Sequence, residues 1–314
     1  MFVSTDRFAI GRRSFLAAAA PLVLGWRSIV EWQTPVERGR FSNDDIPLVR
    51  ERLLELVNAE RKRLDLSRLE LHELACKVAD EHAGDMVEGQ FLSHWGSDGR
   101  KPYQRYSFAG GNDAIQENVS LAQNIASVTA TSVTRDFVDM HESMINEVPP
   151  NDGHRRAILY PHHTHVGFGV AIKHRALRLD ELYVSRYAQV DAIPRQARVK
   201  AKLTLRGNLL NPKHEVTGVY VYYEPLPVPP PVEWLRIPRS YAMPDVYERL
   251  LPKLSGAYYY PNGSKGTIEQ NNRGKFQTPV TLFRDPGINT IVLWIRRAKN
   301  EAPFPATQIC IRCE

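Results

Sequence analysis

The sequence predicts an α+β protein in which helices come first along the chain and strands follow. Apolar residues recur at three- and four-residue intervals between about residues 43 and 148, which is the period of a helix with one buried face. Between residues 166 and 187 the apolar runs become short and typical of strands. Beyond Pro194 the helical period nearly disappears. Because helices that cover an antiparallel sheet form a layered α+β domain, we expect that domain first and an all-β region after it.

The composition limits the class of protein. The chain has 314 residues, enough for one large domain or two ordinary ones, and we expect two. Hydrophobic residues make up 43% and charged residues 24%, which excludes collagen, coiled coils and wholesale disorder. The net charge is +6, but no run of five basic residues occurs, so we expect no nucleic-acid partner. With three cysteines, a hydrophobic core rather than disulfides must stabilise the fold.

Residues 1–42 are expected to be an export signal and a linker. Arg12 and Arg13 precede an apolar stretch at residues 15–25, a pattern typical of a twin-arginine signal. The stretch is far shorter than the roughly 20 residues that span a bilayer. Trp26 and Arg27 follow it, so no clean cleavage site is evident and the segment could remain as an N-terminal membrane anchor. The alternative is an amphipathic helix with a chance arginine pair; the signal predicts a periplasmic or extracellular protein.

Residues 43–192 are expected to form the α+β domain. Asp44 and Asp45 can cap a first helix, whose apolar positions run from Ile46 to Val57. The spacing predicts further helices over about residues 70–88 and 132–148. The strand-like runs at 166–172 and 181–187 predict a hairpin.

Residues 195–314 are expected to form a smaller, β-rich and sandwich-like domain. Strands are predicted at residues 199–205, 215–223, 280–283 and 290–295, with one short helix at about 245–251. The segment from Pro225 to Pro231 should be an extended polyproline II connector.

Four polar side chains of the first domain are candidates for chemistry. His94 follows the second predicted helix, Glu117 lies mid-domain, Glu147 ends the third helix and His154 comes after it. Two imidazoles and two carboxylates that converge can hold a divalent cation or act as an acid/base pair. The gaps of 23, 30 and 7 residues do not establish that they converge. The alternative interpretation is that they cap helices and turns on a solvated rim.

Five short motifs, in this order, resemble the CAP superfamily of cysteine-rich secretory, antigen 5 and pathogenesis-related proteins, and most closely its bacterial SCP-like branch. They are Leu56-Val-Asn-Ala-Glu-Arg61, Phe91-x-Ser-His94, Glu117-Asn118, Gly153-His154-Arg-x-x-Ile-Leu159 and Val166-Gly-x-Gly169. The resemblance covers about residues 45–192.

The resemblance implies an α-β-α sandwich with a large open cleft lined by His94, Glu117, His154 and a glutamate of the third helix. Glu147 fits the position of that glutamate, with Glu142 as the competing choice. In many relatives the two histidines bind Zn²⁺ or another divalent cation, while the carboxylates act through water. The expected metal site is therefore His94, Glu117, Glu147 and His154.

Two functions follow from that site. The first is an exported binding module whose cleft holds a divalent cation and a small-molecule or lipidic ligand, with a cell-envelope polymer as a further partner. The second is a metal-dependent hydrolase of peptide or cell-wall bonds, with Glu117 as candidate base. A hydrolytic zinc site normally has three protein ligands, and two histidines alone bind weakly. We therefore favour binding over catalysis.

Other histidines and the cysteines are weaker candidates. His162, His163 and His165 form a cluster that we expect to be a polar turn, with a second metal site as the alternative. Cys310 and Cys313 would lie on opposite faces of a strand, too far apart for a disulfide.

Overall fold

The computed structural model describes residues 39–314, and the predicted twin-arginine signal lies outside them. The described residues fall within a single compact unit. None of the helices in this part of the chain is both long and apolar enough to cross a membrane.

A four-stranded sheet lies at the centre of the first half of the chain. Its strands are β1 (Glu70–Leu71), β2 (Ala114–Gln123), β3 (His165–Lys173) and β4 (Ala176–Ser185), in the spatial order β1-β3-β4-β2. The β3–β4 hairpin confirms the predicted one. Strand β2 pairs with β4 alone and is therefore an edge strand.

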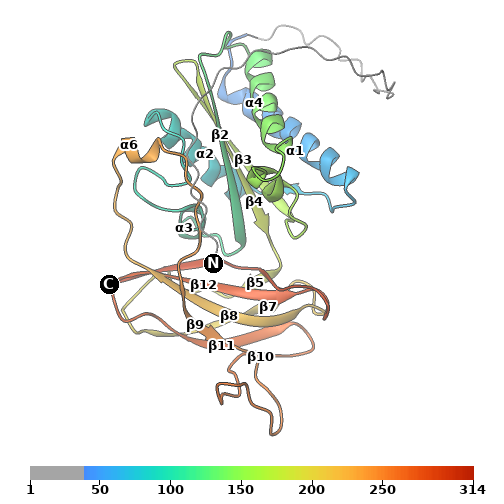
Figure 1. Ribbon diagram of the computed structural model, residues 1–314, viewed down its shortest axis with the longest axis vertical. Helices are drawn as coiled ribbons and strands as arrows, with labels where there is room; N and C mark the ends of the chain where they lie inside the picture. The colour runs from blue at the N-terminus through green and yellow to red at the C-terminus, as the bar shows by residue number, and fades with distance from the viewer. Residues whose placement is uncertain (1–38) are drawn as a thin grey trace. The chain divides into compact units, whose positions relative to one another are not determined.

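Helices cover both faces of this sheet, as Figure 1 shows. One face packs against α2 (Glu73–Glu88) and α3 (Pro102–Phe108). The other face packs against α1 (Ile46–Arg63), α4 (Ala130–Ile145) and α5 (Gly153–Ile158), with a short 3₁₀ turn (Asn43–Asp45) ahead of α1. The expected α-β-α sandwich is confirmed.

Two glycines of β3 explain how closely α2 approaches the sheet. A Cβ atom at Gly167 would lie 2.3 Å from the carbonyl carbon of Ala75, and one at Gly169 would lie 2.0 Å from that of Ala79. Both positions therefore exclude a larger residue unless the helix moves. The close approach places the inward side chains of α2 directly against β3 and β4, and His82 near Glu117 of β2.

The predicted helix boundaries need correction at α2. The helix begins at Glu73 rather than near residue 70, because Glu70 and Leu71 pair with β3 instead. The His72 ring then accepts the Ala75 amide at 3.2 Å and caps the helix. The helices α3 and α5 and the strand β2 were not predicted from the sequence.

The second half of the chain forms two sheets that share one apolar core. The first sheet has the order β10-β11-β7-β5 and the second β6-β14-β12-β8-β9, with β13 paired to β12. The strands are β5 (Ala188–Val190), β6 (Gln196–Ala197), β7 (Lys202–Leu209), β8 (Glu215–Glu224), β9 (Val246–Leu250), β10 (Glu269–Gln270), β11 (Lys275–Thr281), β12 (Gly287–Arg296), β13 (Phe304–Pro305) and β14 (Ile309–Cys313). Leu205 and Phe276 of one sheet and Val219 and Ile291 of the other belong to the same core, which confirms a mostly-β, sandwich-like region.

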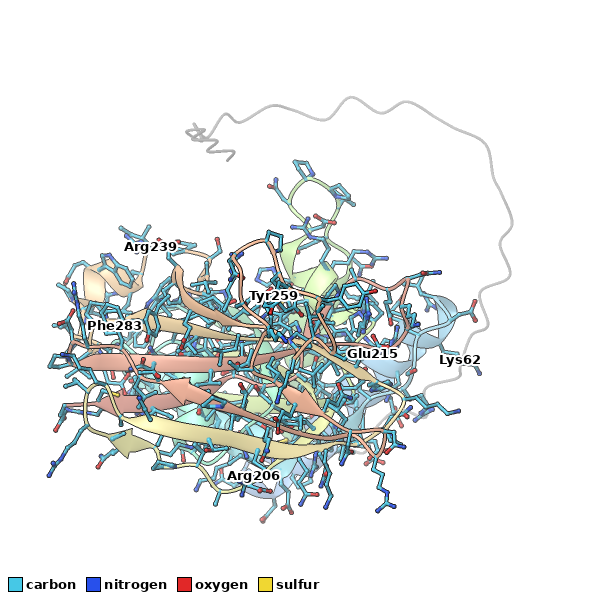
Figure 2. All side chains as sticks on the ribbon, turned by 90° about the horizontal axis from the view of Figure 1, so that it is seen from below. Lys62, Arg206, Glu215, Arg239, Tyr259 and Phe283 are labelled. Carbon is cyan, nitrogen blue, oxygen red and sulfur yellow. The ribbon has the colours of Figure 1, made fainter. Side chains whose placement is uncertain are left out.

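Side chains alternate along these strands as a half-buried sheet requires. On β7, Leu205 is buried whereas its neighbour Arg206 is exposed and projects outward (Figure 2). The helix predicted at residues 245–251 is wrong, since Val246–Leu250 is strand β9 and pairs with β8. Alternating burial along those five residues, rather than a three- to four-residue period, is the reason.

The two halves contact each other within the compact unit. The Cys310 amide in β14 donates to the Ser107 hydroxyl of α3 at 2.7 Å. The division into domains at residues 192–195 stays a prediction. Cys310 and Cys313 belong to different hydrophobic clusters, as expected for opposite strand faces, and both are free thiols.

Candidate cation-binding site

The site contains two histidine–glutamate pairs, and the first joins the partly exposed His94 to the buried Glu117. His94 lies in the loop after α2, and Glu117 points from β2 toward α2 and α3. The His94 Nδ1 atom lies 2.9 Å from the Glu117 Oε2 atom, and the Glu117 side chain is only 1% exposed. Because an ionised carboxylate only accepts hydrogen bonds, His94 must donate through Nδ1. Its Nε2 atom has no hydrogen-bond partner within residues 39–314.

Arg105 of α3 completes the surroundings of Glu117. Its guanidinium forms an ion pair with Glu117 Oε1 and donates to the carbonyl oxygens of His94 at 2.8 Å and Arg100 at 2.9 Å. Burial by itself raises the pKa of Glu117, but Arg105, His82 and His94 outweigh it and lower that pKa to about 2. Glu117 is therefore ionised, and both of its oxygens have partners.

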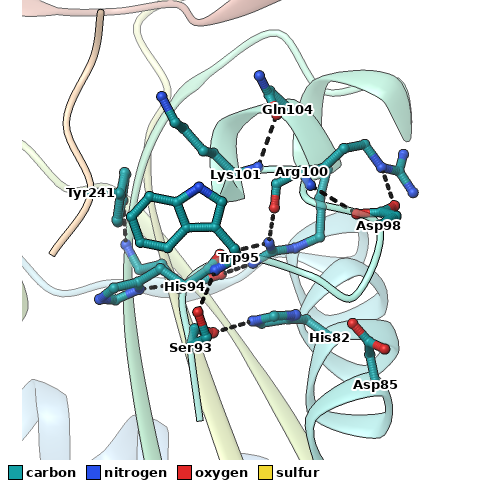
Figure 3. Close-up of polar contacts among 12 residues, drawn as sticks. His82, Asp85, Ser93, His94, Trp95, Asp98, Arg100, Lys101, Gln104 and Tyr241 are labelled. Carbon is teal, nitrogen blue, oxygen red and sulfur yellow. Dashed lines mark hydrogen bonds and ion pairs between the residues drawn. The ribbon is translucent and has the colours of Figure 1, made fainter. Parts of the chain in front are cut away.

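A segment from the second half of the chain lies over this pair. We call residues 225–245, between β8 and β9, the strap; it contains the short helix α6 (Val232–Leu235). The Tyr241 ring of the strap meets the His94 ring edge-on, with centroids 4.9 Å apart (Figure 3). The Glu117 amide donates to the Tyr241 hydroxyl at 3.2 Å. The strap therefore forms one wall of the His94 site.

The strap is held in place at its start and near its middle. At its start, Glu224 accepts hydrogen bonds from Tyr103 at 2.6 Å and Gln104 at 2.8 Å and pairs with Lys101 at 2.7 Å. Further along, Leu235 is buried against an apolar cluster formed by Met86, Phe91 and Val119. The polyproline segment predicted from the sequence is thus an ordered connector that packs on the first half of the chain.

The second histidine–glutamate pair of the site is His154 with Glu147. Glu147, just beyond α4, accepts the His154 Nδ1 hydrogen bond at 2.5 Å and the His154 backbone amide at 2.9 Å. The carboxylate therefore both holds the imidazole ring and caps the start of α5. The competing residue, Glu142, is exposed to solvent. The His154 Nε2 atom, like that of His94, has no hydrogen-bond partner in the described part of the chain.

The edge strand β2 links the two pairs. Glu117 contacts His94, and the next residue, Asn118, donates from its side chain to the His154 carbonyl oxygen at 3.2 Å. Because consecutive strand residues point to opposite faces, the two histidines flank β2 from its two sides. Because β2 is the edge strand of the sheet, no further strand lies beyond it on that side.

Comparisons with known proteins identify the region that contains this site. Residues 54–187 match the family model described as CAP, the cysteine-rich secretory protein family. The region is a CAP domain. The chain is also similar to the protein YkwD of Bacillus subtilis, with 27% identity over 119 residues, 38% of this chain and 40% of the relative. The bacterial CAP resemblance is confirmed, and the chain spans less than half of the length of that relative.

Solved structures of two bacterial proteins are similar to this CAP domain at low overall scores. An outer surface protein from Borrelia burgdorferi shares 20% identity at a TM-score of 0.36, over 48% of this chain and 99% of its own. An extracellular protein with an SCP domain from Bacillus anthracis shares 19% identity at a TM-score of 0.35, over 47% of this chain and 45% of its own.

The CAP domain brings the four predicted residues together in two pairs. His94 contacts Glu117, and His154 contacts Glu147. Within residues 39–314, no three of these four side chains place ligand atoms within 4.8 Å of one another. The carboxylates contact the imidazole Nδ1 atoms, so in this geometry they orient the rings. The four-residue cation site stays a prediction.

Two residues of the CAP site were not predicted from the sequence. Arg105 contacts Glu117 from α3, and Tyr241 contacts it from the strap. The motif Tyr103-Gln-Arg-Tyr106, with a cation between aromatic residues, was an available signal for Arg105. Tyr241 lies 124 residues from Glu117, and nothing local to it indicates the contact.

The three clustered histidines lie apart from this site. His162 stacks on Phe304 with ring centroids 3.7 Å apart, and His163 contacts Gln116 and Ser185 at 3.1 Å each. Both rings are buried, which lowers the pKa of His162 to about 4 and that of His163 to about 3. Pro161 and His162 form a turn, as expected, but the rings of His162 and His163 are buried rather than solvated. The described residues show no metal-ligand group around them.

Proposed function

We propose that this protein is an exported CAP-domain binding module that holds a divalent cation, such as Zn²⁺, between His94 and His154. The supporting observation is that each imidazole donates through Nδ1 to its own carboxylate. Metal-binding histidines are usually oriented in this way, because the bond fixes the tautomer and leaves Nε2 as the metal ligand. The residues present therefore fit a cation held by two histidines.

A cation with two protein ligands has coordination positions left for water or for a ligand. When bound, it would attract an anionic or carbonyl oxygen of that ligand. The neighbouring rings of Trp95 and Trp234, which meet edge-on at 5.2 Å and are partly exposed, offer apolar surface next to His94. This combination supports a small or lipidic ligand with an oxygen-bearing head and an apolar body.

The state of Glu117 favours binding over hydrolysis. A general base works best with a pKa near the working pH, whereas the pKa of Glu117 is lowered to about 2. Both of its oxygens also accept hydrogen bonds, from His94 and from Arg105. Glu117 is therefore suited to hold His94 in place. Hydrolysis is the second candidate function, and no specific observation favours it.

The proposed location outside the cytoplasm is supported by Arg12-Arg13 and the apolar stretch after them. A twin-arginine route exports folded proteins, so it would allow the cation to be bound before export. A cell-envelope polymer or lipid is then an accessible partner.

The test is Zn²⁺ binding to the full chain, followed by calorimetry and by the thermal shift. At a Zn²⁺ concentration a hundredfold above Kd, we expect a stabilisation of about 2.7 kcal/mol from a single site. His154→Gln should remove one bound ion, whereas His174→Gln, which changes an exposed histidine, should not. Retention of that ion by His154→Gln would contradict the proposed site. Turnover of a peptide or cell-wall library that disappears in His154→Gln would replace binding by hydrolysis.

A further inference from the structure

A second group of potential metal ligands lies deeper in the CAP domain. His82 of α2, Glu117 of β2 and Asp180 of β4 each place one ligand atom within 4.8 Å of the other two. All three residues are buried, with relative exposures of 1%, 5% and 1%. Three elements distant in sequence therefore converge on one point between α2 and the sheet.

Unpartnered polar atoms face this point. The His82 Nε2 atom lies 2.8 Å from the Ser93 carbonyl oxygen (Figure 3). A carbonyl only accepts, so Nε2 has the proton and Nδ1 has a free lone pair. Nδ1 and both carboxylate oxygens of Asp180 are buried without a hydrogen-bond partner. Buried polar atoms are nearly always satisfied, so three in one cluster require an explanation.

A proton can satisfy only part of this cluster. A single proton on Asp180 could be donated only once, to Glu117 or to His82. One hydrogen bond leaves the remaining lone pairs unmatched. A cation that contacts His82, Glu117 and Asp180 together would use a lone pair on each.

We propose that His82 Nδ1, Glu117 and Asp180 form a second, buried site for a divalent transition-metal ion of the Zn²⁺ class. One imidazole and two carboxylates are a ligand set that Zn²⁺ accepts, whereas Ca²⁺ and Mg²⁺ prefer six or more oxygens. The Ser93 carbonyl that holds His82 is the kind of outer contact that orients a metal-binding imidazole.

The charges around the cluster are compatible with a dication. Arg105 neutralises Glu117 through the ion pair on Oε1. Ionised Asp180 would then leave one net negative charge in a buried space, which is unfavourable unless a cation compensates it.

A hollow lies beside the cluster. It has a volume of about 340 Å³, and its lining includes His82 and Arg105, and Asp85 and Asp98. Since His82 lines this hollow and also faces the cluster, the proposed route of the ion runs beside its ring.

This site does not depend on the proposed His94–His154 site, although Glu117 contacts both. The experiment counts Zn²⁺ per full-length chain by elemental analysis, after treatment with EDTA, reloading with Zn²⁺ alone and desalting. The wild type should retain two ions. Asp180→Asn and His154→Gln should each retain one, and the double variant none. Loss of a ligand should weaken the affected site by about 100-fold or more.

The variants separate the two proposals. If Asp180→Asn binds as many ions as the wild type, the buried site is overturned. If His154→Gln binds as many but Asp180→Asn loses one, only the His94–His154 site fails. Asp113→Asn is the matched control, because Asp113 is also buried but accepts a hydrogen bond from Tyr106, and it should retain two ions.

A second measurement covers the case in which Asp180→Asn does not fold. X-ray absorption of Zn²⁺-loaded His154→Gln should show one imidazole and two or more oxygen ligands at about 2.0–2.2 Å. Adding His82→Gln to this variant should remove the imidazole signal. A spectrum of Zn²⁺ bound by water alone would overturn the proposal.

Discussion

Asp180 and Glu181 are neighbours on β4, yet they meet opposite surroundings. Both are almost fully buried, at 1% and 0% exposure, and the pleat of the strand sends them to opposite faces of the sheet. Glu181 faces α4 and accepts hydrogen bonds from His141 at 2.6 Å and from Tyr183 at 2.8 Å. Asp180 faces α2, and neither of its oxygens has a partner.

Two neighbouring carboxylates on one strand can therefore have different roles, one stabilising the fold and the other suited to binding an ion. On the α4 side a histidine and a tyrosine supply donors to Glu181, and the His141 Nε2 atom has no partner among residues 39–314. On the α2 side the neighbouring side chains of His82 and Glu117 offer acceptors, so Asp180 needs a proton or an ion. Burial alone therefore does not distinguish the two roles; the available donors do.

The largest expected effect is from Glu181→Gln. The change removes the charged acceptor from buried His141 and Tyr183, so we expect a loss of about 2–4 kcal/mol of unfolding free energy. Urea denaturation at neutral pH measures it. Glu142→Gln, an exposed glutamate on the same helix as His141, is the control and should cost less than about 0.5 kcal/mol. A loss for Glu181→Gln as small as that of the control would show that the α4-side cluster is not structural.

The pH dependence of stability tests the α4 side of this comparison, and the expected effect is of intermediate size. Burial lowers the pKa of His141, but the charge and hydrogen bond of Glu181, with Glu142 and Glu60 nearby, raise it above its ordinary value of 6.5. A raised pKa means that the stabilisation is fully present below pH 6.5 and is lost as the pH rises through the folded-state value. We expect His141→Gln to cost about 1–3 kcal/mol near pH 6 and less at higher pH. An equal cost from about pH 5.5 to pH 9 would contradict this.

The smallest expected effect is from Asp180→Asn, measured in EDTA. The amide has the shape of the protonated acid that Asp180 forms without an ion, so stability at neutral pH should stay within about 0.5 kcal/mol of the wild type. Urea denaturation beside Glu181→Gln compares the same chemical change at adjacent positions. A loss equal to that of Glu181→Gln would mean that Asp180 is ionised and satisfied in the metal-free protein.

The periodic parts of the fold could be predicted from the sequence. The apolar positions of α1 and α4 recur at helical spacing, and those helices and the β3–β4 hairpin were predicted within a few residues. Strand β2 was not predicted because two polar residues of the site, Glu117 and Asn118, lie within it and break its apolar pattern. Residues 246–250 were predicted as helix because the segment is too short for its period to be distinguished from that of a strand.

The candidate site was predictable only where a motif is local. His94, Glu117 and His154 each stand in a short motif of the CAP resemblance, and Glu147 is seven residues from His154. His82 and Asp180 have no such motif, because their neighbourhood exists only once α2 packs on β4. The positions of His82 and Asp180 depend on packing between elements far apart in the chain, which no local sequence pattern indicates.

The strap has a practical meaning for anyone who divides this chain. A fragment that ends near residue 192 would retain every motif of the CAP resemblance but would lose Leu235 and Tyr241. Met86, Phe91 and Val119 would then face water, and His94 would lose its aromatic neighbour. Such a fragment would be prone to self-association. Its site would lack the wall that the strap forms, so its ligand selectivity would differ from that of the intact protein.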